Sequence, residues 1–270
     1  MAEPPRADPA EADAVDFTAD AFMGGRLRLR QPGRGHRAGT DALLLAAAAP
    51  ADFDDLALDV GAGVGAAGLA LAALRRKARI GLVEIDPATA AFARQNLVLN
   101  DMAERGEVFE ADALAPPRRR AAGLVDASAG LVISNPPFFD PRRARSSPDA
   151  DRRRAHSAPD DGEAGASYEA WLAAWIAACL ALARPGGDFI LIHRPEALRV
   201  ILNSLEGRAG AATVLPVQAR ADSPAIRILV RARKGSRAPL SIAPALALHE
   251  GARFTPMAEA IHRGEAVIAW

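Results

Sequence analysis

Strand-like and helical patterns alternate through the first half of the chain. Short runs rich in apolar and β-branched residues occur at 56–60, 79–83, 107–111 and 130–133. A helix is predicted over Leu69–Arg76 after the first run, and Asp86-Pro87 begins another after the second, with proline at its favoured first helical position. Alternation of this kind predicts an α/β fold with a doubly wound, mostly parallel sheet.

The second half continues with one long helical pattern and three further strands. The helix is predicted over Tyr168–Ala183, with Trp171, Trp175 and Cys179 on a single core-facing side. The short link 218–225 favours an antiparallel pair of strands at the sheet edge. The remaining predicted elements are strands at 189–192, 212–217 and 226–233 and helices at 196–205 and around 255–262.

Segments of different composition divide the chain. Residues 1–15 are rich in proline, alanine and acidic residues, which predicts a disordered tail before a single domain over 16–270. Gly24-Gly25 between short apolar pieces predicts a hairpin, and 113–123 is expected to be a Pro/Arg loop. Residues 140–166 form a polar insertion that is long for a connector, so we expect a mobile substrate loop there.

A glycine-rich turn follows the first strand. Gly61, Gly63 and Gly65 stand between that strand and the next helix, and they let the backbone approach a ligand where any Cβ would clash. Glu84 lies roughly 20 residues further on, where a carboxylate accepts hydrogen bonds from ribose hydroxyls. Dinucleotides and S-adenosylmethionine both suit this frame. Asp59, just before the glycines, suits a cationic amino acid group and favours the second.

The fourth strand carries the other candidate chemistry. It leads to Ser134-Asn135-Pro136-Pro137-Phe138, where the two prolines end the strand because neither can donate to a sheet ladder. Asn135 is therefore left at the carboxyl end of a strand, which is where α/β sheets bind ligands. Glu84 and Asp112 end two other strands in the same way, so the sequence predicts one polar edge.

This turn suits methylation of a planar amino group, which is a poor nucleophile because its lone pair is delocalised. The side-chain carbonyl of Asn135 would accept one N–H, and the backbone carbonyl of Ser134 or Pro136 would accept the other. Phe138 would stack on the substrate ring, which is worth about 1–3 kcal/mol. The rigid prolines, Pro136 and Pro137, keep the acceptors preorganised, and no general base is required.

Composition and charge limit the binding partners, metal sites and cellular locations that we expect. The 270 residues carry no formal net charge, so no global attraction to nucleic acid follows. Arginines nonetheless crowd 142–154, where Arg152, Arg153 and Arg154 are either phosphate contacts or part of a solvated loop. Cys179 is the only cysteine and the histidines are scattered, so no metal site is expected. Neither a signal peptide nor a membrane-length apolar stretch occurs, which indicates a cytoplasmic protein.

Together these motifs resemble the class I S-adenosylmethionine-dependent amino-group methyltransferases, and more narrowly the bacterial tRNA(Val) adenine-N6 methyltransferase family. The resemblance implies a Rossmann-like fold with a seven-stranded, mostly parallel sheet and an antiparallel edge strand. It also implies S-adenosyl-L-methionine as cofactor and, as substrate, the tRNA adenine beside the anticodon. The segments that carry it are 39–45, 59–65, Glu84, Asp112, 135–138, 231–235 and 248–250.

The same resemblance implies residue roles. Glu84 would hold the ribose and Asp112 the adenine of the cofactor, while Asn135 holds the acceptor. Thr40 or Asp41 is also the expected N-cap of the helix that follows. Alternatives are methylation of guanine N2 in rRNA, methylation of a protein glutamine, and a cofactor- or RNA-binding module without catalysis. The implied cofactor contacts are Thr40, Asp41, Asp59, Gly61, Gly63, Gly65, Glu84 and Asp112.

Overall fold

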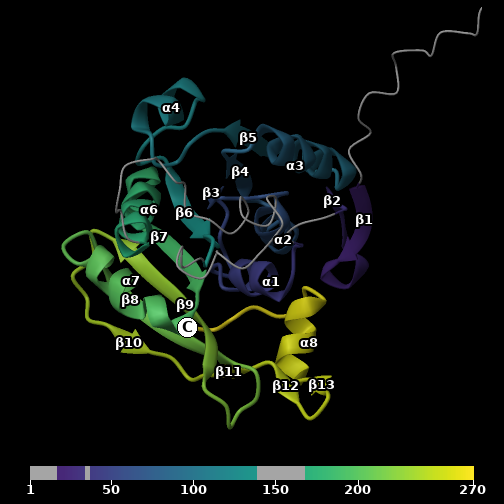
Figure 1. The fold of residues 1–270 in the computed structure, drawn as a ribbon, viewed down its shortest axis with the longest axis vertical. Coiled ribbons are helices and arrows are strands. Elements are labelled where there is room, and N and C mark those ends of the chain that lie inside the picture. The colour runs from purple at the N-terminus through teal and green to yellow at the C-terminus, as the bar shows by residue number, and fades with distance from the viewer. Residues whose placement is uncertain (1–16, 34–36, 139–167) are drawn as a thin grey trace, which may run out of the picture.

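A central β-sheet with helices on both faces forms the body of the protein. The computed structural model describes residues 17–33, 37–138 and 168–270 (Figure 1). Seven long strands run in the order β5-β4-β3-β6-β7-β9-β8, and the two-residue strands β10 and β11 pair with β8. Their bounds are β3 Leu56–Val60, β4 Arg79–Glu84, β5 Gly106–Glu110, β6 Ala129–Ser134, β7 Ala183–His193, β8 Ala209–Gln218, β9 Ala225–Lys234, β10 Ser241–Ile242 and β11 Leu246–Ala247.

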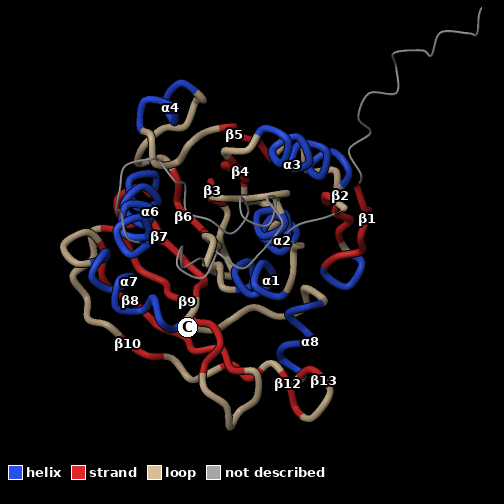
Figure 2. Tube along the Cα trace, viewed as in Figure 1, coloured by secondary structure: helices blue, strands red, loops and turns tan. Residues whose placement is uncertain are grey.

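Helices α1, α2 and α3 pack on one face of the sheet, and α6 and α7 pack on the other (Figures 1 and 2). Two small antiparallel pairs, β1–β2 and β12–β13, lie outside the sheet. The helices are α1 Thr40–Ala47, α2 Ala66–Leu74, α3 Pro87–Leu99, α4 Pro116–Ala121, α6 Tyr168–Leu182, α7 Leu198–Leu205 and α8 Pro256–His262, with 3-10 turns η1 Met23–Gly25 and η3 Pro195–Ala197. The small pairs are β1 Phe17–Phe22 with β2 Leu27–Pro32, and β12 His249–Glu250 with β13 Arg253–Phe254.

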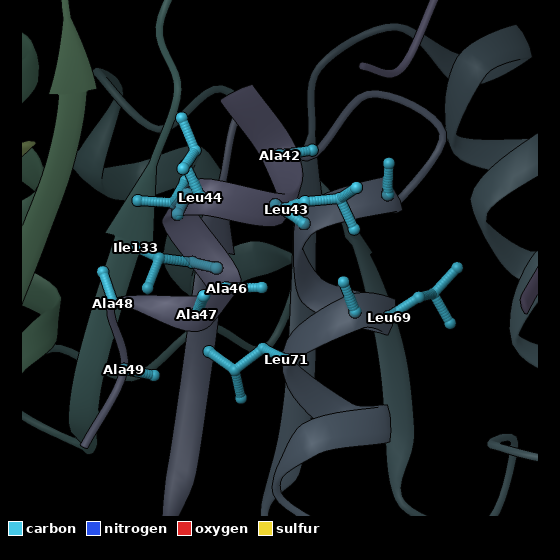
Figure 3. Packing of buried hydrophobic residues seen from close by; sticks show 14 of the residues in the cluster. Ala42, Leu43, Leu44, Ala46, Ala47, Ala48, Ala49, Leu69, Leu71 and Ile133 are labelled. Atoms are coloured by element: carbon cyan, nitrogen blue, oxygen red, sulfur yellow. The ribbon is translucent and has the colours of Figure 1, made fainter. Parts of the chain in front are cut away.

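Alternation along the buried strands builds two hydrophobic cores. Leu131 and Ile133 of β6 belong to the core under α1 and α2, whereas Val132 between them belongs to the core under α6 and α7. Figure 3 shows Ile133 among side chains of α1 and α2. Because both faces are covered, the strands read as continuous apolar runs, which is typical of parallel sheets.

The structure confirms the doubly wound, mostly parallel sheet and corrects three details. The antiparallel strand is β9, which lies between β7 and β8, so it is one position inside the edge. The expected loop at 113–123 contains α4, which begins at Pro116. The predicted N-cap at Thr40 or Asp41 is wrong, because the N-cap residue is Gly39 and no side chain caps α1.

Some expectations concern residues outside the described ranges. These are the disordered tail at 1–15, the mobile insertion at 140–166, and the arginines Arg152, Arg153 and Arg154 within it. Across the parts that the structure describes, no helix is both long enough and apolar enough to cross a membrane.

Asn96 joins the β1–β2 hairpin to the body of the protein. Its side chain is fully buried, and its Oδ1 accepts a hydrogen bond from the backbone N–H of Arg30 at 2.7 Å. Its Nδ2 donates to the carbonyls of Arg30 and Val64 at 2.9 and 3.0 Å. Val64 belongs to the glycine turn, so one amide side chain links β2, α3 and that turn.

Asn96→Ala is expected to lower the free energy of unfolding by about 1–3 kcal/mol, because it leaves buried backbone groups of Arg30 and Val64 unpaired. Asn100→Ala is the matched control, since Asn100 makes the equivalent two bonds with Arg28 at a more exposed position. Urea unfolding compares the variants. An equal loss of unfolding free energy in Asn96→Ala and Asn100→Ala would contradict the view that burial makes the Asn96 hydrogen bonds more stabilising.

Candidate functional site

Four neighbouring strands end at one edge of the sheet. β3 pairs with β4 on one side and with β6 on the other, and β5 lies beyond β4, all of them parallel. The glycine turn after β3, Glu84 at the end of β4, Asp112 after β5 and Asn135 after β6 therefore lie at the same edge of the sheet. Figure 1 shows β3, β4, β5 and β6 side by side. The structure brings together the residues that the sequence placed at strand ends.

The glycine turn after β3 is tied to the next strand. The N–H groups of Gly61 and Ala62 both donate to the carbonyl of Val83, at 2.9 and 3.0 Å. Gly63 has a φ of 57°, and a Cβ built there would meet nothing within 4 Å. A Cβ on Gly61 would instead lie 3.0 Å from the ring of Trp175. Gly63 thus faces open space, whereas Gly61 accommodates a side chain of the protein itself.

Asp59 lies inside the protein beneath this turn. It is 2% exposed, and its Oδ2 accepts a hydrogen bond of 2.8 Å from the backbone N–H of Gly68 in α2. Burial raises the pKa of Asp59 to about 7; the bond from Gly68 lowers it, and the nearby charge of Glu84 raises it further. The carboxyl group anchors α2 to β3, and its contact with a ligand's cationic group stays a prediction.

Glu84 is held by three backbone N–H groups at the mouth of the turn. Its Oε2 accepts from Gly63 at 2.9 Å, and its Oε1 accepts from Ile85 and Asp86, both at 2.9 Å. Burial raises the pKa of Glu84, and these three bonds oppose that shift. An ionised carboxylate has about four lone-pair sites, so Glu84 keeps capacity to accept from a ligand hydroxyl.

A cavity of about 370 Å³ lies between the ends of β4 and β5. Ile85 is one wall and is 55% exposed, which is unusual for an apolar side chain next to a buried strand. Asp112 is another wall, and its Oδ1 accepts from the N–H of Leu114 at 2.9 Å. An apolar wall beside a carboxylate suits a planar ring that carries an amino group. Sequence reasoning missed Ile85, whose signal is its place directly after Glu84.

Ser134 and Asn135 mark the end of β6. Ser134 is fully buried; its hydroxyl donates to the carbonyl of Val60 at 2.8 Å and accepts from Nε1 of Trp175 at 2.9 Å. The Oδ1 atom of Asn135 is also buried, yet it accepts no hydrogen bond from any described residue. Leaving a buried acceptor unpaired costs about 1–3 kcal/mol. A ligand N–H would supply the missing donor.

Tyr168 of α6 contacts the proline turn through its hydroxyl group. Its hydroxyl lies 2.7 Å from the carbonyl of Pro137 and 2.6 Å from Nε2 of His193. A carbonyl can only accept, so the phenol donates to Pro137. A neutral imidazole has one N–H, and we place it on Nε2, where it donates to the phenol oxygen, because Nδ1 lies 3.4 Å from the carbonyl of Arg194, a much longer contact. Burial raises the pKa of Tyr168 and lowers that of His193 to about 4, so both groups are neutral at pH 7.

Phe138 is surrounded by a histidine and two arginines. The ring of His193 packs edge-on against it with centroids 4.8 Å apart. The guanidinium carbons of Arg227 and Arg194 lie 4.9 and 5.8 Å from its centroid. Arg227 also donates from Nε to Oδ2 of Asp41 at 2.9 Å, so the start of α1 is linked to Phe138. The proline-turn motif alone gives no sign of four residues around it, because they are distant from the turn in sequence: Tyr168, His193, Arg194 and Arg227.

Thr40 meets the C-terminal part of the chain. Its Oγ1 is hydrogen-bonded to Nε2 of His262, the last residue of α8, at 3.0 Å. The chain then returns to the other end of α1, where the N–H of Ile268 donates to the carbonyl of Ala47 at 2.9 Å. Contacts of Thr40 and Asp41 with a cofactor stay predictions. No group of three or more metal-ligating side chains is found within the described ranges.

Comparison with known proteins identifies the family to which the chain belongs. Residues 37–150 match the methyltransferase small domain family. A protein of Serratia proteamaculans named tRNA1(Val) (adenine(37)-N6)-methyltransferase is 31% identical over 72% of this chain and 69% of its own length. The chain belongs to the class I S-adenosyl-L-methionine-dependent methyltransferases. This confirms the family, the fold class and the cofactor expected from the sequence.

Other relatives agree on the family and differ in their names. A Shewanella amazonensis protein with the same name as the Serratia relative is 39% identical, over 40% of this chain and 44% of its own length. The chain therefore matches less than half of the length of that relative. A solved structure from Agrobacterium tumefaciens, described as a predicted O-methyltransferase, is 33% identical and covers 85% of this chain and 99% of its own, with a TM-score of 0.69.

Asp59→Asn is expected to change how stability depends on pH. In the folded protein the pKa of Asp59 is raised to about 7 from 3.8, so the folded state binds the proton more tightly than the unfolded state. This contribution is fully present below about pH 4 and is lost as pH rises through 7. The variant should therefore gain stability relative to the parent between pH 5 and pH 8, by about 2–3 kcal/mol.

Urea unfolding of the cofactor-free protein at the two pH values measures this difference. Asp54→Asn, at an exposed position just before β3, is the control and should shift neither value. His193 changes the free energy of unfolding in the opposite direction. Its pKa is lowered in the folded protein, so its contribution to stability falls as pH drops from 6.5 to 4. A parallel pH dependence in parent and Asp59→Asn would contradict the assignment.

Tyr168→Phe is expected to lower the free energy of unfolding by about 1–3 kcal/mol, because the Pro137 carbonyl and the His193 Nε2–H both lose their partner. Thermal and urea unfolding measure the loss. The side-chain resonances of His193 should shift as well, since its ring loses the phenol oxygen. Unchanged stability and unchanged His193 resonances would show that this bridge does not form.

Proposed function

We propose that this protein transfers a methyl group to the exocyclic N6 of an adenine in tRNA, the adenine beside the anticodon of a valine tRNA. The observation that carries the proposal is the buried Oδ1 of Asn135 at the end of β6, which accepts no hydrogen bond from any described residue. The names of the Serratia and Shewanella relatives support the choice of adenine and of tRNA. That substrate favours the cytoplasm, and we propose a single catalytic domain over 16–270.

The residues at the sheet edge fit S-adenosyl-L-methionine. Gly63 faces open space, Glu84 keeps acceptor capacity for ribose hydroxyls, and the cavity beside Ile85 and Asp112 has the size and chemistry for an adenine ring. A volume of about 370 Å³ lies in the range of small-ligand pockets. When bound, this cofactor supplies an electrophilic methyl group on a sulfonium sulfur.

An amino group as acceptor follows from the pair of oxygens at the proline turn. Asn135 offers its unpartnered Oδ1, and the carbonyl of Pro136 accepts no hydrogen bond from the described residues. The carbonyl of Pro137 is already taken by Tyr168. Two free acceptors match the two hydrogens of an NH₂ group, whereas a hydroxyl acceptor has only one hydrogen. This favours N-methylation over the O-methylation in the Agrobacterium protein's description.

The side-chain oxygen of Asn135 and the backbone carbonyl of Pro136 would orient the amino nitrogen of the substrate and stabilise its developing positive charge. Holding both hydrogens fixes the plane of the amino group and favours localisation of its lone pair as the new N–C bond forms. The nitrogen gains a positive charge in that step, and the two oxygens stabilise it. The extra proton leaves afterwards to water. His193 takes no part as a base, because its Nε2 already carries a proton that is donated to Tyr168.

The direct test is transfer of labelled methyl groups to unmodified bulk tRNA, followed by digestion and nucleoside analysis. The expected product is N6-methyladenosine. Formation of N2-methylguanosine, of a 2′-O-methylated nucleoside, or of labelled protein in place of labelled RNA would overturn the proposal in favour of another acceptor.

Asn135→Ala is expected to lower kcat by about 10²–10³-fold, the usual loss when one preorganised polar contact to the reacting group is removed. Binding of S-adenosylhomocysteine, measured by calorimetry, should stay within about twofold of the parent. Asn100→Ala provides a control for loss of an asparagine remote from the site. Equal loss of turnover and of cofactor binding in Asn135→Ala would contradict the assigned role.

A further inference from the structure

Two arginines stand side by side at the acceptor end of the sheet. β7 ends at His193, and the ladder pairs His193 with Ile228 of β9. Arg194 and Arg227 are the next residues on the two strands, and both guanidinium groups lie over the ring of Phe138. Like charges on neighbouring strands disfavour folding. Their placement at the ligand-binding edge therefore points to an anionic ligand.

Among the described residues, only Asp41 forms an ion pair with either arginine, so the two arginines keep a net positive charge. Asp41 forms an ion pair with Arg227 at 2.9 Å, which leaves that side chain 27% exposed. Arg194 is exposed and has no ion-pair partner in the described part of the chain. Glu196 is two residues away and also exposed, yet no ion pair joins it to Arg194. His193 is neutral at pH 7, so it neither adds to nor cancels the charge.

We infer that Arg194 and Arg227 bind a phosphodiester of the RNA backbone next to the acceptor nucleotide, an inference that rests on the proposed function. A base that enters between Asn135 and Phe138 must leave its stack, and its own backbone then crosses the rim of the pocket. The planar guanidinium fork matches phosphate oxygens in two-point contacts. Arg227 is preorganised by Asp41, and Arg194 is free to move from Phe138 to the phosphate.

This pair gives the site a preference for polynucleotide over a free nucleoside. A nucleoside offers the same amino group to Asn135 but lacks the charge that Arg194 and Arg227 attract. This pair is distinct from Arg152, Arg153 and Arg154. Arg227 lies on β9 and Arg194 directly follows β7, and both guanidinium groups lie over the ring of Phe138.

The test measures binding of a fluorescent RNA hairpin with the anticodon stem-loop sequence of valine tRNA, by anisotropy over a series of salt concentrations. Arg194→Gln should weaken binding about tenfold near 0.1 M salt and reduce the slope of log Kd against log salt by about one. Arg194→Lys keeps the charge and should restore most of the slope. S-adenosylhomocysteine binding should match the parent in both variants, and thermal stability should not fall in either, because Arg194→Gln removes a like-charge contact.

Arg199→Gln is the matched control, because Arg199 is an exposed arginine nearby that pairs with Glu169 at 3.1 Å. It should leave the slope unchanged. An unchanged slope in Arg194→Gln, or an equal decrease in Arg199→Gln, would overturn the inference. Binding requires no turnover, so a normal Arg194 effect together with methylation at a group other than adenine N6 would refute the proposed function alone.

Discussion

The pairing of β3 with β6, reinforced by one buried hydroxyl group, sets the distance between the glycine turn and the proline turn. Ser134 ends the strand that leads to the proline turn, and its hydroxyl donates to the carbonyl of Val60, which precedes the glycine turn. It also accepts from the indole of Trp175, whose ring fills the space beside Gly61. Methyl transfer depends on a near-attack distance between donor and acceptor, and small displacements are costly. The buried bond between two neighbouring strand ends makes that distance a property of the sheet, not of the loops.

The proline turn, residues 135–138, is supported by elements that are distant in sequence. Tyr168 of α6 and His193 of β7 hold the Pro137 carbonyl through a directed chain of hydrogen bonds. On the other side, Arg227 of β9 joins Phe138 to Asp41 at the start of α1. The same antiparallel strand thus supplies both a sheet neighbour for β7 and a contact to the acceptor ring. These contacts attach the Pro137 carbonyl and the Phe138 ring to the body of the fold.

The sequence was sufficient for the sheet, the glycine turn and the proline-stopped strand end, because each depends on local chemistry. Strand periodicity, Gly63 at positive φ and the missing N–H of Pro136 are all readable within a few residues. The position of β9 inside the edge was not, since the order of strands depends on packing across the whole sheet. Nor were Tyr168 and His193, whose roles exist only once α6 and β7 lie together. Thr40 looked like a helix cap, but its hydroxyl instead meets His262, and Gly39 begins the helix.

The unpaired oxygen of Asn135 has a consequence for molecular discrimination. This oxygen is buried and accepts no hydrogen bond from any described residue, so an N–H that reaches it satisfies an acceptor that would otherwise stay unpaired. Hypoxanthine carries a carbonyl where adenine carries its amino group. In the same position its carbonyl oxygen would face Oδ1 of Asn135, and the lone pairs of the two acceptors would repel. Sites built around a buried polar group discriminate strongly against partners that leave it unsatisfied. In the role proposed for Asn135, this single oxygen would distinguish adenosine from its deaminated form.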